Sequence, residues 1–559
     1  MEDHTFFGRK NSANLVKALM LIFSVLILII PDILISSDES LISILMFLTY
    51  KVSILLFIGS FVLSILRSYY YTYLVVGIPY LISSFFEIPN VLILDQYITV
   101  DNVKAVFYTN GNEMSDFLSK FSAYFMMPLV ILFLYVLVLL KLRSFKYSFK
   151  TKRILAFSFL FLIVSVTIPV IRYYNSPMRF KDHNRPLYII KKYYLKQHPF
   201  NLYYRLYEYS RIRHKFNESK KQKETFKFGV QNNLEDAAKN PELVIFFIGE
   251  KSRYLNWSVN GYDRETSPYL SKIDELITFS RHYSNANSTS NSIPLIITQA
   301  TPGNPGIAFS QKTIVSLFKE AGYKTAWISA QNVFDYLENE DEVDTLVQLY
   351  KKSSYSDLDI IPVFNSVLKK DHYDKLFVVI NLLGGHHHKL PDRFYVFSPN
   401  NKNSDYEVSY KNRQVFINEY DNMILLEDSV ISKVIKLTEK QSLSSIVVFT
   451  SDHGCNLFEN SNLFGYGSSH PTENELHVPL FIWASEKYCK NNPAEWTVLK
   501  SHREVLTTND NLFYTLADMA HIKYKLYKNS LSIADTSYVS SDPLPLYING
   551  GLKYFDVSK

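Results

Sequence analysis

The stretch LVIFFIGE, residues Leu243–Glu250, is a run of six apolar residues that ends in a glycine and a carboxylate. Runs of this length that are rich in β-branched and aromatic residues are typical of strands buried on both faces. Similar runs follow at Thr325–Ser329, Leu376–Leu383, Ile446–Thr450 and Pro479–Trp483. Helical patterns lie between them, as at Thr313–Ala321 and Asn422–Lys440. This alternation predicts an α/β domain with a mostly parallel central sheet over residues 241–559.

Polar groups follow three of these predicted strands at their carboxyl ends. They are Glu250 after the first strand, Gly384-Gly385-His386-His387-His388 after the third, and Ser451-Asp452-His453-Gly454 after the fourth. Because the carboxyl ends of parallel strands meet at one edge of a sheet, we expect these groups to lie together. Glu, Asp and His suit Zn²⁺, Mn²⁺ or Fe, and the set contains no thiolate unless Cys455 joins it. Each group alone is more typical of a surface turn, and the histidine run of a solvated segment, so the metal-site hypothesis depends on their coincidence.

The first third of the chain is strongly apolar, although only 47% of all 559 residues are hydrophobic. It contains five apolar segments of about 20 residues, the length of a helix that crosses ~30 Å of hydrocarbon. These segments are Leu15–Ile35, Leu45–Leu66, Tyr71–Leu94, Phe121–Leu142 and Ile154–Tyr173. The sequence therefore predicts a five-helix transmembrane domain over residues 1–174, which either only anchors the protein or takes part in its activity. We expect the ammonium of Lys51 to extend toward the membrane surface, and Pro79, Glu87 and Pro89 either to kink the third helix or to bring it to the membrane interface early.

Basic residues in the loops predict how these helices are oriented. They concentrate before the first segment, between the second and third, and between the fourth and fifth, at Arg9, Lys10, Arg67, Lys141, Arg143, Lys146, Lys150, Lys152 and Arg153. We therefore expect the N-terminus in the cytoplasm and everything after Tyr174 on the opposite side of the membrane. Residues 175–240 form a linker, in which Tyr188–Tyr209 fits either amphipathic helices at the bilayer surface or a solvated connector.

Charge and cysteine content exclude several classes of protein. The net charge of +6 is small for this length, and no basic stripe with interleaved aromatic residues occurs, so we expect no nucleic-acid partner. Cys455 and Cys489 allow at most one internal disulfide, which excludes a small disulfide-stabilised fold.

A series of longer motifs extends across the chain in order. They are Thr109-Asn110-Gly111-Asn112-Glu113, Gly249-Glu250-Lys251-Ser252-Arg253 with Asn256, Gly261-Tyr262-Asp263-Arg264-Glu265-Thr266-Ser267-Pro268, Thr289-Ser290-Asn291-Ser292-Ile293-Pro294, Gly384-Gly385-His386 with Arg393, Tyr420-Asp421-Asn422 and Thr450-Ser451-Asp452-His453-Gly454. Together with the five-segment layout, they resemble the bacterial phosphoethanolamine transferases, which belong to the sulfatase/alkaline-phosphatase superfamily.

The resemblance implies a two-step transfer in the bacterial inner membrane. Phosphatidylethanolamine gives its headgroup to an enzyme threonine, and diacylglycerol leaves. A sugar of lipopolysaccharide, in lipid A or in the core, then takes the group. The position that matches this threonine is Thr289, whereas Ser292 and Thr298 are the alternative hydroxyls. Taken alone, Thr289 would be read as a helix-capping residue in a polar loop.

The resemblance also implies a cofactor and a set of site residues. Zn²⁺ is expected to be held by Glu250, Thr289, Asp452 and His453, and metal coordination would activate the threonine hydroxyl. His386 resembles the family's imidazole near the phosphoryl group, where it would act as an acid or a second-metal ligand. The residues expected at the substrate are Thr109, Glu113, Arg393 and His470.

Two positions depart from the pattern of that family. Cys455 follows Asp-His-Gly where the family usually has Glu, and Tyr466 occupies the usual place of a second phosphate-binding histidine. Either His470 or His477 substitutes nearby, or this histidine is missing. The alternatives to a phosphoethanolamine transferase are a phosphoglycerol transferase and a non-catalytic protein that binds lipid. A membrane-bound sulfatase is disfavoured because its nucleophile would be Cys or Ser.

Overall fold

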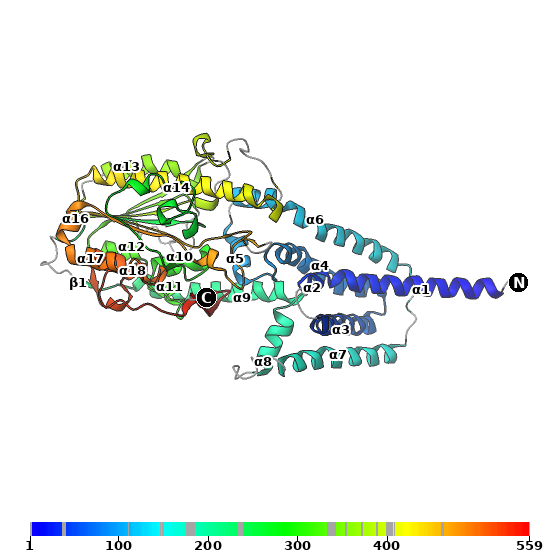
Figure 1. The fold of residues 1–559 in the computed structure, drawn as a ribbon. Helices are drawn as coiled ribbons and strands as arrows, with labels where there is room; N and C mark the ends of the chain where they lie inside the picture. The colour runs from blue at the N-terminus through cyan, green and yellow to red at the C-terminus, as the bar shows by residue number, and fades with distance from the viewer. Residues whose placement is uncertain are drawn as a thin grey trace. The chain divides into compact units, whose positions relative to one another are not determined.

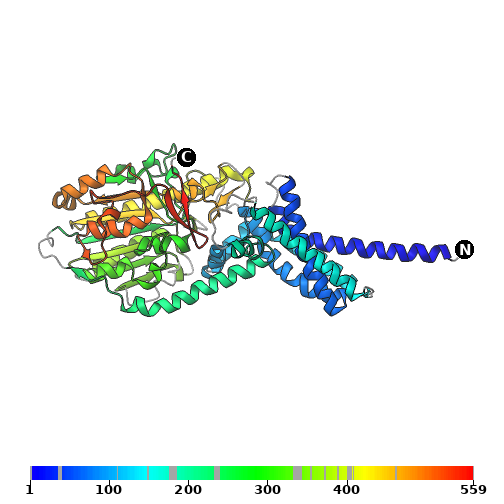
Figure 2. The ribbon, with the colours of Figure 1, turned by 90° about the horizontal axis from the view of Figure 1, so that it is seen from below.

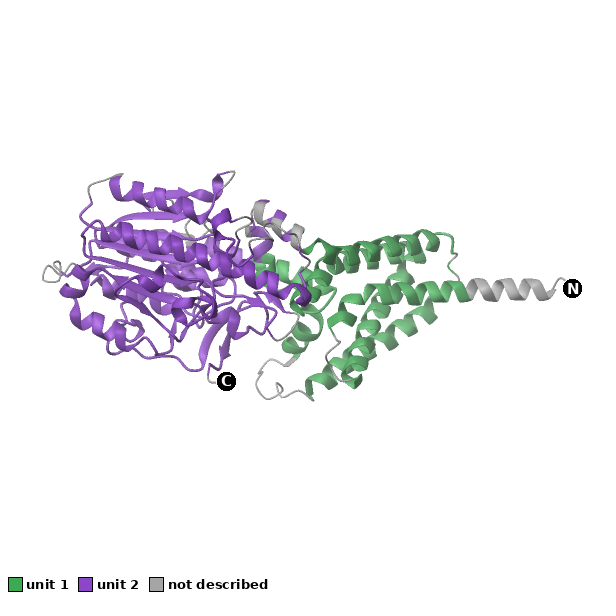
Figure 3. Cartoon of the chain, turned by 45° about the horizontal axis from the view of Figure 1, so that its top comes forward, with its two compact units in different colours: residues 1–103, 118–210 green, residues 104–117, 211–559 purple. Residues whose placement is uncertain are grey.

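The computed structural model, drawn from two sides in Figures 1 and 2, contains two compact units. It describes the chain apart from residues 1–2, 36–40, 110, 146, 148–149, 175–184, 232–238, 332–342, 353–354, 371–372, 387–389, 399–405, 407, 460–462 and 558–559. Unit 1 comprises residues 1–103 and 118–210, and unit 2 comprises residues 104–117 and 211–559 (Figure 3). The short segment 104–117 therefore belongs with the C-terminal part of the chain.

Unit 1 is helical in its described residues. Its helices are α1 (Asp3–Leu28), α2 (Ile30–Ile35), α3 (Leu41–Leu66), α4 (Tyr69–Leu94), α7 (Thr151–Tyr174), α8 (Arg185–Ile190) and a π-helix (Lys191–Leu195), and it shares α5 (Val100–Tyr108), α6 (Gly111–Leu142) and α9 (Phe200–Thr225) with unit 2. Within the described residues, four helical segments are long and apolar enough to cross a membrane: Leu41–Leu66, Tyr69–Leu94, Phe121–Leu142 and Thr151–Tyr174.

The first apolar segment differs from the prediction of one continuous helix. Helix α1 ends at Leu28, and its apolar part, Leu15–Leu28, is shorter than a membrane-crossing helix requires. Helix α2 begins at Ile30, directly before Pro31. Proline has no N–H to donate to the preceding helical turn, which accounts for the interruption. The predicted count of five crossing helices is therefore not confirmed.

The prediction that Lys51 extends toward the membrane surface is wrong, because its side chain is buried in unit 1. Its Nζ lies 2.8 Å from Asp32 Oδ1, and neither side chain is more than 3% exposed. The same ammonium donates to the carbonyl of His198, and Tyr97 donates its hydroxyl to Asp32. A buried charge is costly unless it is paired and hydrogen-bonded, so this network explains how a lysine is tolerated here.

Helix α4 remains continuous through Pro79 and Pro89. Glu87 on this helix is fully buried and accepts hydrogen bonds from the backbone of Ile98 and the amide of Asn201. The backbone of Ile98 and the amide of Asn201 therefore satisfy this carboxylate within unit 1.

The core of unit 2 is a seven-stranded sheet with the order β3-β11-β8-β2-β7-β5-β6. The strands are β2 (Leu243–Gly249), β3 (Leu276–Thr278), β5 (Lys324–Ser329), β6 (Thr345–Gln348), β7 (Leu376–Asn381), β8 (Ser445–Ser451) and β11 (Leu480–Ala484). Strand β2 pairs in parallel with β7 and β8, whereas β11 runs antiparallel to β8 and β3. The sheet is therefore mixed. The described part of the connection from β8 to β11 contains two short strands and the one-turn helix α15 (Glu473–Leu476), but not the longer helix that usually makes a parallel crossover.

Helices cover both faces of this sheet (Figure 1). Leu243, Ile245 and Phe247 of β2 pack in a core with α13 (Ile360–Lys370) and α14 (Arg413–Glu439). The alternate residues Val244, Phe246 and Ile248 pack in a second core with α10 (Thr289–Ile297), α12 (Ile314–Glu320) and α18 (Leu512–Met519). Both faces of β2 are thus buried, which explains its unbroken apolar sequence.

Shorter elements complete unit 2, including a β14–β15 hairpin near the C-terminus, drawn in red in Figure 2. They are β1 (Val230–Gln231), β4 (His282–Tyr283), β9 (Asn456–Leu457), β10 (Phe464–Gly465), β12 (Thr507–Thr508), β13 (Lys523–Tyr524), β14 (Leu544–Ile548), β15 (Gly551–Phe555), α11 (Ile307–Ser310), α16 (Glu486–Asn491) and α17 (Pro493–Ser501).

Replacing either partner of the buried Lys51–Asp32 ion pair of unit 1 should destabilise the protein. We expect Lys51→Met or Asp32→Leu to cost about 3–5 kcal/mol each, because each leaves an unpaired buried charge. The double variant Lys51→Met/Asp32→Leu should recover most of this loss. The measurement is thermal unfolding of the detergent-purified full chain, analysed as a double-mutant cycle. Additive effects of the two substitutions would show that the two charges do not depend on each other.

Candidate functional site

The pairing of two parallel strands places two carboxylates side by side. Gly249 at the end of β2 is in register with Ser451 at the end of β8. The next residues along these strands, Glu250 and Asp452, therefore leave the sheet at the same edge. The backbone N–H of Asp452 donates to the carbonyl of Gly249 at 3.1 Å, which extends the pairing up to the site.

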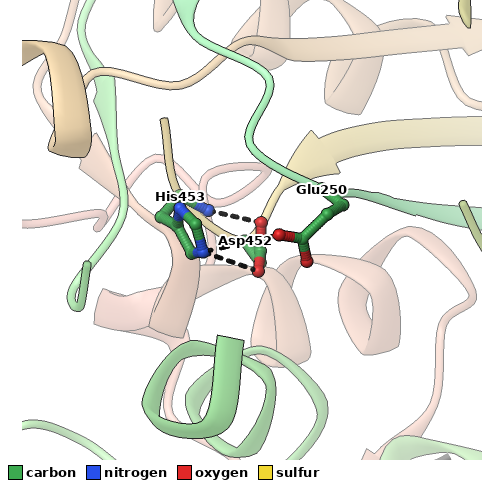
Figure 4. A group of neighbouring side chains, drawn as sticks. All are labelled: Glu250, Asp452 and His453. Carbon is green, nitrogen blue, oxygen red and sulfur yellow. Dashed lines mark hydrogen bonds and ion pairs between the residues drawn. The ribbon is translucent and has the colours of Figure 1, made fainter. Parts of the chain in front are cut away.

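Glu250, Asp452 and His453 form a compact cluster at this edge (Figure 4). All three are completely buried, and one potential ligand atom of each lies within 4.8 Å of the others. His453 Nε2 lies 3.3 Å from Asp452 Oδ2 and 3.7 Å from Glu250 Oε1. The structure thus brings together the three carboxylate and imidazole groups that the sequence analysis expected as metal ligands.

The ring of His453 is oriented by its own loop. Its Nδ1 lies 2.7 Å from the carbonyl of Gly454, which can only accept, so the proton is assigned to Nδ1. Burial lowers the pKa of His453 to about 4, which keeps the imidazole neutral at pH 7. Its Nε2 therefore presents a free lone pair to the two carboxylates, as in histidines that bind a metal.

The two carboxylates need a positive partner. Asp452 Oδ2 is buried and accepts no hydrogen bond from any residue that the structure describes, whereas Glu250 Oε1 has the imidazole of His386 3.2 Å away. Burial, followed by the neighbouring charge of Glu250, raises the pKa of Asp452 well above its usual range. Both effects disfavour two ionised carboxylates in this place without a cation. The donor set of two carboxylates and one imidazole fits a divalent metal such as Zn²⁺.

Thr289 places a hydroxyl against this cluster. Its Oγ1 donates to Glu250 Oε2 at 3.0 Å and lies 3.3 Å from His453 Nε2. Thr289 is the first residue of α10, so the free N–H groups of the first helical turn surround it. Such a helix start favours negatively charged groups, which suits a phosphoryl group at this hydroxyl.

The two alternative hydroxyls are engaged elsewhere. Ser292 donates to the backbone carbonyl of Asp452, and Thr298 donates to the carbonyl of Pro294 within its own helix. Both side chains are buried. Thr289 is therefore the hydroxyl among these three that contacts the side chains of the cluster.

His386 lies on the other side of Glu250, where it contacts a lysine. Its Nε2 is 3.2 Å from Glu250 Oε1, and its Nδ1 is 3.1 Å from the Nζ of Lys251. A lysine ammonium can only donate, so Nδ1 is assigned as the acceptor. His387 and His388, which follow in the sequence, lie outside the described residues.

Two predicted substrate residues lie away from the cluster. Arg393 is exposed, with its guanidinium 5.0 Å from the ring centroid of Phe394. His470 is also exposed. His477, its alternative, is stacked between Tyr254 and Tyr283, with its Nε2 3.0 Å from the carbonyl of Ser280. No described hydrogen bond joins any of the three to the carboxylate–histidine cluster.

Tyr466 occupies the position beside the cluster where a second imidazole was considered. The centroid of its ring lies 4.2 Å from that of His453. Cys455 is buried with a free thiol whose pKa burial raises to about 12, and its sulfur is not part of the group formed by Glu250, Asp452 and His453. Cys489 is also free, so the structure contains no Cys455–Cys489 disulfide.

The segment 104–117 supplies a contact to the helix of Thr289 that sequence reasoning missed. Lys104 is buried and donates to Asn291 Oδ1 at 2.8 Å, in the first turn of α10. The predicted substrate residue Thr109 lies on the same segment, where its hydroxyl donates to the carbonyl of Ala105. The side chain of Glu113 lies outside the described residues. No pattern in the sequence points from Lys104 to Asn291, because they are 187 residues apart.

Several residues of the longer motifs form a hydrogen-bond network near the cluster. Asp421 on α14 accepts hydrogen bonds from Asn256, Tyr262 and Arg264. Gln331, which was not predicted, donates to both Glu250 Oε2 and the carbonyl of Leu382. These residues fix the loops that leave β2, β5 and β7, so their role is to position the site.

The amino-acid sequence of this chain is similar to a family model and to curated proteins. The sulfatase family model matches residues 242–522. The phosphoethanolamine transferase EptC of Escherichia coli (strain K12) is 24% identical over 327 residues, covering 55% of this chain and 56% of the relative. EptA of Salmonella typhimurium is 26% identical over 322 residues, covering 53% of this chain and 57% of the relative. The matched region thus spans just over half the length of these curated relatives.

Solved structures extend the similarity in fold to nearly the whole chain. The integral membrane protein lipooligosaccharide phosphoethanolamine transferase A of Neisseria meningitidis aligns with a TM-score of 0.71 at 20% identity, covering 92% of this chain and 98% of that one. The C-terminal periplasmic domain of EptC from Escherichia coli, solved in complex with Zn, aligns with a TM-score of 0.51 at 23% identity, covering 57% of this chain and 93% of that one.

Adding one methyl group at Gly384 should disturb Glu250. Gly384 has a φ of +49°, and a Cβ there would lie 2.5 Å from the carbonyl oxygen of Glu250 and 2.9 Å from Glu427 Oε1. We expect Gly384→Ala to displace Glu250 and to lower both metal affinity and turnover, since a misplacement of about 1 Å can cost roughly 10²-fold in rate.

Gly303→Ala is the matched control, because the nearest neighbour of its added Cβ would be 4.0 Å away. Metal content of the purified variants, measured by atomic emission, checks the prediction. A Gly384→Ala protein with the metal content of the wild type would show that the approach of Gly384 to Glu250 is not required for the site.

Proposed function

We propose that this chain, which belongs to the sulfatase family, is a zinc-dependent transferase that moves phosphoethanolamine from phosphatidylethanolamine to lipopolysaccharide. The observation that supports this most directly is the contact of the Thr289 hydroxyl, at 3.0 Å, with Glu250 of the buried cluster. The transferred group is inferred from the names of the relatives, which are phosphoethanolamine transferases. The acceptor would be a sugar of lipid A or of the lipopolysaccharide core.

The metal would be held by Glu250, Asp452 and His453, with the hydroxyl of Thr289 as the fourth ligand. Their separations and the unsatisfied Oδ2 of Asp452 favour this ligand set. When bound, Zn²⁺ would lower the pKa of the threonine hydroxyl and withdraw charge from the phosphoryl oxygens.

In the first step, Thr289 Oγ1 forms a bond to the phosphorus of phosphatidylethanolamine. The bond from phosphorus to the glycerol oxygen breaks, and diacylglycerol leaves with a proton on that oxygen. Glu250 Oε2, which already accepts the hydroxyl hydrogen bond of Thr289, is placed to receive its proton. The N–H groups at the start of α10 favour the negative phosphoryl oxygens.

In the second step, an oxygen of the acceptor attacks the same phosphorus. The bond from phosphorus to Thr289 Oγ1 breaks, and Thr289 takes up a proton in place of the one that the acceptor hydroxyl loses. One site thus serves both half-reactions, with the headgroup held as a phosphothreonine ester in between. His386, beside Glu250, is the candidate acid for these proton transfers.

The location in the membrane follows from the same proposal. Residues 1–174 would form the domain that spans the inner membrane, with the N-terminus in the cytoplasm, residues 175–240 the interfacial linker, and residues 241–559 the periplasmic catalytic domain. Thr109 and Glu113 lie on the segment between α4 and the apolar part of α6, and this segment belongs to unit 2. They are therefore the candidates to contact the ethanolamine headgroup, and Arg393 and His470 are candidates for the acceptor.

The metal proposal predicts a loss of metal from a variant of one ligand. Asp452→Ala should lose most of its zinc and all measurable transfer, because one of the three protein ligands is removed. Asp518→Ala, which removes a carboxylate that pairs with Lys523, is the control and should keep both. Zinc is measured on the detergent-purified full chain. Full zinc occupancy in Asp452→Ala would show that the ligand set is wrong.

The nucleophile proposal predicts a loss of turnover without a loss of metal. We expect Thr289→Ala to lower diacylglycerol release from labelled phosphatidylethanolamine by on the order of 10³-fold or more. Its zinc content and unfolding temperature should remain those of the wild type. Ser290→Ala removes the neighbouring hydroxyl and serves as the control.

The outcomes of this assay separate the alternatives. Release by Thr289→Ala at the wild-type rate would exclude Thr289 as the nucleophile. Wild-type protein that binds zinc but releases no diacylglycerol from phosphatidylethanolamine would indicate another donor, such as phosphatidylglycerol. Wild-type protein with neither zinc nor release would favour a non-catalytic role in lipid binding.

A further inference from the structure

We infer that Lys251 is a phosphoryl-binding residue whose ammonium contacts the non-bridging oxygens of the group in transfer. The inference rests on the proposed function and extends it, because it assigns a substrate contact to a residue outside the expected site. It is based on the backbone conformation of Lys251, the packing of its stem and the position of its ammonium.

The backbone of Lys251 is held in a conformation that side chains rarely adopt. Its φ is +58°, in the left-handed region, which is sterically unfavourable for a residue other than glycine. Two contacts fix it there. Its N–H donates to Asp452 Oδ1 at 3.2 Å, and its carbonyl accepts from the hydroxyl of Tyr420 at 2.6 Å. This conformation fixes the direction in which the side chain leaves the strand, immediately beside Glu250.

The stem of Lys251 packs against a glycine in the loop after β7. A Cβ on Gly385 would lie 2.8 Å from both Cβ and Cδ of Lys251. Any larger residue at position 385 would therefore displace the lysine stem. The double glycine of this loop has two roles: Gly384 leaves room for Glu250, and Gly385 leaves room for Lys251.

The ammonium of Lys251 lies between two rings that contact the cluster. It is 3.1 Å from His386 Nδ1 and 4.8 Å from the ring centroid of Tyr466. His386 in turn contacts Glu250, and Tyr466 packs on His453. Lys251 is partly exposed, so its head can reach a molecule that enters from solvent.

The chemistry of this position favours an anion. A phosphoryl group in transfer carries negative charge on its non-bridging oxygens, and a lysine offers three donors together with a positive charge. Tyr466, at the position expected for a histidine, brings no positive charge, and no described hydrogen bond links His470 or His477 to the cluster. Lys251 supplies a positive charge on this side of the site, opposite two carboxylates that would repel the substrate.

The test measures binding of two soluble probes, inorganic phosphate and O-phosphoethanolamine, to the zinc-loaded full chain in detergent by isothermal titration calorimetry. We expect Lys251→Met and Lys251→Gln to raise the dissociation constants about tenfold or more. Lys251→Arg keeps the charge and should retain a large part of the affinity. Zinc content, measured on the same samples, should be unchanged in all three. Lys272→Met, which removes an exposed lysine of the same unit, is the control and should bind both probes like the wild type.

The outcomes distinguish this inference from the proposed function. Wild-type affinity for both probes in Lys251→Met and Lys251→Gln would overturn the inference. A loss of zinc in these variants would also overturn it, because Lys251 would then act by holding Glu250. Weaker probe binding with intact zinc supports it, even if the wild type releases no diacylglycerol, and in that case the proposed function alone fails.

Discussion

The parallel pairing of β2 with β8 is the constraint on which the site depends. Because of this pairing, Glu250 and Asp452 lie next to each other, both buried, directly after the two strands. The backbone N–H of Asp452 donates a hydrogen bond to the carbonyl of Gly249. Two buried carboxylates at this distance repel each other unless a cation lies between them. The free Nε2 of His453 and the hydroxyl of Thr289 converge on the same point. The geometry of the strands thus favours a cation at this point, and the hydroxyl of Thr289 lies where the proposed function places its nucleophile.

Residues of the longer motifs stabilise this arrangement through hydrogen bonds outside the cluster. Asp421 on α14 collects hydrogen bonds from the Asn256, Tyr262 and Arg264 side chains, which holds the loop after β2 against the helix. Tyr420 on the same helix donates to the carbonyl of Lys251 and so supports its left-handed backbone. Such residues do not touch a substrate, yet they determine where the charged groups of the site lie. Their substitution is expected to act through the positions of Glu250 and Lys251.

The departures from the family pattern are grouped around one side of the cluster. Tyr466 packs on His453, Lys251 lies over Tyr466, and Cys455 is buried with its thiol protonated. Tyr466 and the Lys251 ammonium thus lie together beside the cluster, as the inferred phosphoryl contact of Lys251 requires. Unit 1 has its own buried charges, of which Lys51 and Asp32 form an ion pair.

The pattern of the amino-acid sequence predicted five of the seven strands of the central sheet, the grouping of Glu250, Asp452 and His453, and the apolar segments from Leu41 onward. These features follow from local periodicity and from the rule that parallel strands end at one edge of a sheet. The pattern missed the edge strands β3 and β6, which have only three and four residues. It was the fold that revealed the antiparallel direction of β11, the pairing of Lys51 with Asp32, the contact of Lys104 with Asn291 and the contact of Lys251 with His386. Each of these depends on a contact between residues far apart in the chain, where no periodic pattern links the partners and packing alone selects the pair.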